Sequence, residues 1–175
     1  MKIVSVIEAI SIWSGKAVSF LLLGLIGAIT YEVVARYVFD APTTWAYETI
    51  IYSAGILYVI GGAYTLQARG HVIVDVVYNM FSPRGKASLD IFICFIFFLI
   101  YVGIVLVMGG RAGWESFLGN EHTGSMWDPP LYPVKAMVPI GFFLILLQGL
   151  AKLIRDVKTL ITGKADVRTV ITGEA

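Results

Sequence analysis

Four long apolar stretches fill most of this 175-residue chain and constrain its fold more than any other feature. Residues 49–68 and 91–110 carry no charge, and the runs at 17–31 and 136–151 are extended by apolar flanks. A bilayer core requires about 20 apolar residues per helix. The chain is therefore predicted to be an all-α integral membrane protein with four transmembrane helices, which excludes most classes of soluble enzyme.

The chain forms a single predicted membrane domain, residues 1–175, because little sequence remains outside the spans. We place the spans at about 16–39, 45–68, 88–110 and 134–155, and a tail at 156–175. Charged residues make up 14% of the chain, against about 25% in ordinary soluble domains. The net charge of +1 gives no indication of a nucleic-acid partner.

One or two amphipathic helices are expected to lie in the membrane interface. At about 71–82, His71, Asp75 and Asn79 recur every four residues among apolar neighbours, which favours an interfacial helix over a strand. Residues 1–15 also place apolar side chains at spacings of three and four. That segment is either a second interfacial helix or an extension of the first span.

The distribution of basic residues predicts the orientation of the chain. Ten of the 13 lysines and arginines fall at the N-terminus, between the second and third spans, or in the tail. The first and third connections contain only Arg36, Arg111 and Lys135. By the positive-inside rule, both termini are cytoplasmic.

Ionisable groups inside an apolar layer are costly, so Glu32, Arg36 and Glu48 are the first candidates for function. Glu32 lies one helical turn before Arg36, and Glu48 follows just across the hairpin. The three are expected to form one cluster, as a structural clasp, a partner contact or a proton or ion site. An arginine between two acids keeps both ionised, which favours the clasp. Thr43 or Thr44 is expected to cap the second span.

Gln148 is the other deep polar group, and we expect it to hydrogen-bond across helices. Gly24, Gly27, Gly61 and Gly62 allow close helix approach. The single cysteine, Cys94, is interpreted as a packing residue. Two histidines predicted on opposite sides of the membrane are too few for a metal site or for haem. No cofactor and no enzymatic activity are expected.

Three segments resemble the small membrane subunit of tripartite ATP-independent periplasmic (TRAP) transporters. The first is Arg36-Tyr37-Val38-Phe39 followed by Pro42, Trp45 and Glu48, the second Arg69-Gly70-His71-Val72 with Asp75, and the third Pro139-Ile140-Gly141-Phe142 with Gln148. The individual motifs are loose, but their order, the length and the span count match over nearly the whole chain. The resulting structural or partner-interface candidates are Glu32, Arg36, Trp45, Glu48, Arg69, His71, Asp75 and Gln148.

The resemblance implies a scaffold subunit in a bacterial inner-membrane uptake system. In such a system a periplasmic solute-binding protein captures the solute, commonly an organic acid. A large multispan subunit then moves the solute, driven by sodium ions that it binds itself. The alternative is a self-sufficient four-span exporter that works as a dimer with Glu32 as proton carrier. The strong charge bias speaks against the dual insertion that such exporters can show.

The topology can be tested with single cysteines at Gly124 and Ser88 in a Cys94→Ala background. An impermeant thiol reagent added to intact cells should label Gly124→Cys, which we place outside, and should spare Ser88→Cys. The opposite labelling pattern would show that the orientation predicted from the basic residues is wrong.

Overall fold

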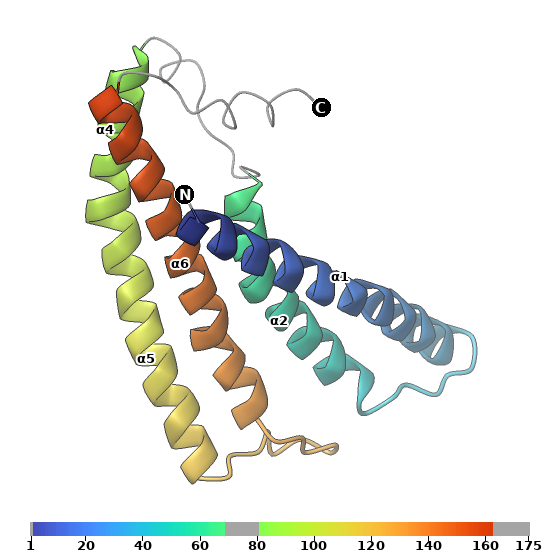
Figure 1. The fold of residues 1–175 in the computed structure, drawn as a ribbon. Helices are drawn as coiled ribbons and strands as arrows, with labels where there is room; N and C mark the ends of the chain where they lie inside the picture. Colours follow the sequence, from blue (N-terminus) through green and yellow to red (C-terminus); the bar gives the residue numbers. More distant parts are fainter. Residues whose placement is uncertain (1, 69–80, 163–175) are drawn as a thin grey trace.

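The computed structural model describes residues 2–68 and 81–162, which form an all-helical bundle (Figure 1). Helix α1 spans Lys2–Tyr37, α2 spans Ala46–Gln67 and α6 spans Tyr132–Thr162. The third span is composite: α4 (Pro83–Ile93), the π-helical segment η1 (Cys94–Phe98) and α5 (Leu99–Leu118) follow one another directly.

Four helices are long and apolar enough to cross a membrane, at Val4–Tyr37, Ala46–Gln67, Ser88–Leu118 and Tyr132–Thr162. The predicted fold class of four membrane-spanning helices is confirmed. Within the described residues the only strand-like pairing is an isolated bridge between His122 and Pro130. The side of the membrane on which the termini lie stays a prediction.

Residues 2–15 belong to α1, so the extension of the first span is the alternative that the structure shows. α1 contains 36 residues and is about 54 Å long at 1.5 Å per residue. That length far exceeds a hydrocarbon core of about 30 Å. Figure 1 shows α1 beginning beside α6 and running obliquely away from it, alongside α2. The other predicted interfacial helix, at about 71–82, falls almost entirely outside the described residues.

The turn between α1 and α2 departs from the prediction that a threonine caps the second span. α2 begins after Trp45, which makes no side-chain capping bond. The chain reverses at Asp40, whose φ of 49° is left-handed, and the amide of Ala41 donates to the carbonyl of Ala35 at 2.9 Å. The predicted cap is wrong because the Thr43 side chain is engaged by α1, as described below.

Helix α6 is the centre of the bundle. It contacts α1, α2, α4 and α5, whereas α1 packs mainly on α2 (Figure 1). Of the four glycines expected to allow close approach, only Gly62 meets a neighbour, Ile145 of α6. The closest approaches occur instead at two glycines of α6, Gly141 and Gly149.

Gly141 and Gly149 let α6 touch two different helices. A Cβ on Gly141 would lie 2.9 Å from the carbonyl oxygen of Val59, so the backbones of α2 and α6 nearly touch there. A Cβ on Gly149 would overlap the ring of Phe98, the last residue of η1. Both glycines are therefore required by contact between helices, as is common in membrane proteins.

Gly141→Ala should force α2 away from α6 and destabilise the bundle by about 1–3 kcal/mol, the usual cost of overpacking. Thermal unfolding of the purified protein in mild detergent would measure the loss. Gly103→Ala is the matched control, because nothing lies within 4 Å of a Cβ at that position of α5. Equal melting temperatures for the two variants would contradict the close crossing.

Candidate functional site

A compact group of hydrogen bonds joins Glu32, Arg36 and Thr43 at the hairpin end of α1. Nε of Arg36 donates to Glu32 Oε1 at 3.0 Å, and a second guanidinium nitrogen pairs with the same oxygen. The other carboxylate oxygen accepts from the Thr43 amide at 3.2 Å and from the Thr43 hydroxyl. Glu32 is buried. Both of its oxygens are thus occupied, and the group, which we call the outer clasp, holds the hairpin on α1.

Glu48 is not part of the outer clasp, so the predicted three-residue cluster is wrong in that respect. Glu48, Tyr52, Val59 and Gly62 follow one another on α2 at spacings of four, seven and three, which places them on one helix face. Val59 and Gly62 of that face contact α6. Glu48 therefore lies on the side of α2 turned toward α6. Its Oε2 atom is buried without a hydrogen-bond partner among the described residues.

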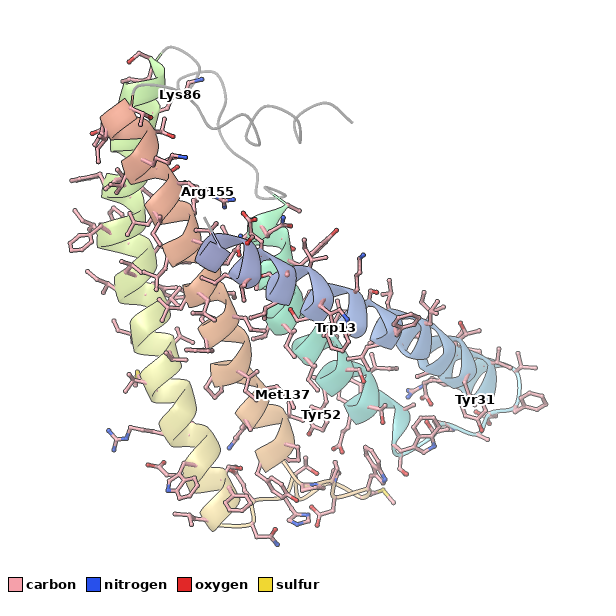
Figure 2. The ribbon with its side chains drawn as sticks, viewed as in Figure 1. Trp13, Tyr31, Tyr52, Lys86, Met137 and Arg155 are labelled. Carbon is pink, nitrogen blue, oxygen red and sulfur yellow. The ribbon has the colours of Figure 1, made fainter. Side chains whose placement is uncertain are left out.

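A second group of polar contacts, the inner clasp, ties α6 to α1 and α4 at the opposite end of the bundle. Arg155 pairs with Glu8 of α1, and Figure 2 shows Arg155 beside the first turns of that helix. Lys152 bonds to Asp90 of α4 at 2.9 Å and to Asp156, one turn along α6, at 3.0 Å. None of these residues was predicted from the sequence to belong to a site. Of these contacts, only the Lys152–Asp156 pair could be predicted from the sequence, because residues four apart are neighbours on a helix surface.

Gln148 makes the interhelical hydrogen bond expected of it. The Ser11 hydroxyl of α1 donates to its Oε1 at 3.2 Å, and Gln148 is 1% exposed. Its Nε2 has no partner in the described part of the chain. Gln148 thus lies one turn before Lys152 and extends the inner clasp toward the bundle centre.

Of the four remaining candidates, one makes an aromatic contact and three lie outside the described residues. Trp45 stacks on Tyr31 of α1, with ring centroids 5.8 Å apart. This contact closes the hairpin beside the outer clasp. Arg69, His71 and Asp75 lie outside the described residues.

The loop between α5 and α6 is folded by its own hydrogen bonds. The amide of Leu131 donates to the Glu121 carbonyl at 2.8 Å, and the amide of Gly124 donates to an Asp128 carboxylate oxygen at 2.8 Å. The hydrogen bond from Lys135 lowers the pKa of the Glu121 carboxyl below its usual range. Met126 at the tip is 92% exposed.

The two clasps consist of ion pairs and hydrogen bonds between side chains and the backbone. Each pairs opposite charges between neighbouring helices or along one helix, and no carboxylate of the outer clasp is left without donors. Among the described residues no group of three histidine, cysteine or acidic side chains could hold a metal ion. The inner clasp thus joins α1, α4 and α6, and the outer clasp joins α1 to the turn that follows it.

A family model described as "Tripartite ATP-independent periplasmic transporters, DctQ component" matches residues 25–159. The match begins within α1 and ends within α6, so it includes the outer clasp, Glu48 and Gln148. No curated protein matches the chain.

Thr43→Val should remove the hydroxyl bond to Glu32 while keeping the shape of the side chain. We expect a loss of about 1.5–3 kcal/mol, typical of a hydrogen bond to a charged group. The midpoint of thermal unfolding in detergent measures it.

Thr44→Val is the matched control, because Thr44 is exposed and adjacent. A loss as large for Thr44→Val as for Thr43→Val would mean that the Thr43 bond to Glu32 does not hold the hairpin.

Proposed function

This chain belongs to the DctQ component family of tripartite ATP-independent periplasmic transporters, and we propose from that premise that it is the scaffold of a sodium-driven uptake system. It holds a large multispan subunit in the bacterial inner membrane. A periplasmic solute-binding protein delivers an organic acid or a similar small solute. The large subunit, not this chain, binds the sodium ions and the solute.

The observation that carries the scaffold proposal is the pairing of charges within the bundle. Glu32 is held by Arg36 and Thr43, Glu8 by Arg155, and Asp90 by Lys152. A coupling residue must exchange its proton or ion during the cycle, whereas Glu32 has donors on both oxygens. This arrangement suits permanent contacts between helices and argues against the exporter with Glu32 as proton carrier.

The helices themselves also fit a scaffold better than a transport pathway. Transporters build their sites from pairs of interrupted helices in related repeats. Here the one irregular segment of the described spans is η1, and it serves to place Phe98 against Gly149. α6 continues through Pro139 without interruption.

The buried carboxylate oxygen of Glu48, which is unpaired among the described residues, supports a contact with the large subunit. A buried carboxylate oxygen without a donor is costly in an apolar layer. Farther along the same face of α2, Gly55 is exposed and has nothing within 4 Å of a Cβ. Lipid chains offer no hydrogen-bond donor. We assign the missing donor to a helix of the large subunit that packs beside the Glu48 end of α2, away from the Val59 and Gly62 contacts with α6.

In mild detergent the chain should purify as a heteromer with the large subunit. Glu48→Ala should lower recovery of the heteromer about tenfold, the equivalent of one hydrogen bond to a charged group of roughly 1.5 kcal/mol. Glu115→Ala is the control, because Glu115 is exposed on α5. Co-purification followed by quantitative mass spectrometry measures both.

Two results would contradict the scaffold role. The first is solute transport by the isolated chain in liposomes. The second is a Glu32→Gln variant that assembles normally but shows abolished transport per complex or an altered dependence on sodium and pH. Either would place the transport chemistry in this chain.

A further inference from the structure

We propose that the first turns of α1 bind an anionic phospholipid, with their apolar face in the lipid and Lys16 on the lipid phosphate. We call residues 2–16 the N-terminal arm. The arm precedes the region matched by the family model, which begins at residue 25. The scaffold role rests on the contacts of the arm with α6, whereas this inference concerns the opposite side of the arm.

One side of the arm makes polar contacts with α6. Glu8 pairs with Arg155, and Ser11 donates to Gln148. Both contacts belong to the inner clasp. Because residues three apart lie on one face of a helix, these bonds fix the arm in rotation as well as in position.

The opposite side of the arm is apolar and open. Val6, Ile10 and Trp13 follow one another at spacings of four and three, and Trp13 is 76% exposed. They line a shallow groove of about 500 Å³ together with Ser5, Ala9 and Ser14. Trp13 projects from α1 in Figure 2. An exposed stripe of this kind is unfavourable in water, which requires an apolar environment around the arm.

The contacts of the arm place it toward one end of the bundle. Glu8 pairs with Arg155, the last residue of the fourth predicted span, and Lys16 is the first residue of the first predicted span. Lys16 can therefore extend its ammonium toward the lipid headgroups while its carbon chain stays in the apolar layer. Tryptophan is the side chain that prefers this interface.

Charge decides which lipid fits. Lys16 lies three residues after Trp13, is exposed, and forms no ion pair within the described part of the chain. The acid of the arm, Glu8, faces α6 and is paired there. Among the side chains that the structure describes, the open face thus presents one ammonium and no carboxylate. A lipid with a net negative headgroup complements it, whereas a zwitterionic one brings its own cation.

The test uses the purified complex of this chain with its large subunit, titrated with phosphatidylglycerol and followed by native mass spectrometry. Lys16→Gln should weaken phosphatidylglycerol binding about fivefold, the effect of one lysine at an anionic surface. Lys158→Gln, which removes another exposed lysine near the same end, should leave binding unchanged. Phosphatidylcholine should bind more weakly and equally to all three proteins.

A photo-crosslinking amino acid in place of Ile10 or Trp13, activated in membranes, identifies what covers the arm. Phospholipid adducts are the expected product. Adducts with the large subunit would overturn the proposal and make the arm a protein interface. Equal losses of phosphatidylglycerol binding for Lys16→Gln and Lys158→Gln, or no loss for either, would also overturn it.

Discussion

The contact on which the bundle depends is the crossing of α2 over α6 at Gly141. In a bilayer, lipid tails are as apolar as the helix surfaces, so helices associate through close packing and polar contacts rather than through the hydrophobic effect. The missing side chain at Gly141 brings the backbone of Val59 into contact with α6. Without this crossing, the α1–α2 hairpin would touch the rest of the bundle only through the start of α1.

The two clasps build on that crossing in different ways. The outer clasp is confined to α1 and the turn that follows it, so it determines how the hairpin closes but not where it sits. The inner clasp joins α1, α4 and α6 through Arg155 and Lys152 and therefore positions whole helices. Hydrogen-bonded ion pairs suit this task, because a charge separated from its partner in an apolar layer is strongly unfavourable.

A scaffold in a membrane must combine internal rigidity with surfaces for others. Most described apolar side chains of α1 and α5 are exposed, and lipid or protein has to cover them. In the proposed complex, the Glu48 end of α2 faces the large subunit and the arm faces lipid, so the two contacts use different surfaces of the chain.

The amino-acid sequence alone determined the four spans, because their apolar runs are long and local, and it identified Glu32 with Arg36, because one turn separates them. It also indicated Gln148 as a group that bonds between helices. Only the tertiary structure decided that Thr43 donates hydrogen bonds to Glu32 rather than capping α2, and that Glu48 lies on the side of α2 that faces α6. It likewise selected Gly141 and Gly149 from many glycines and paired Glu8 with Arg155. These outcomes depend on how helices distant in sequence rotate and cross, and periodicity along one helix carries no information about its neighbour.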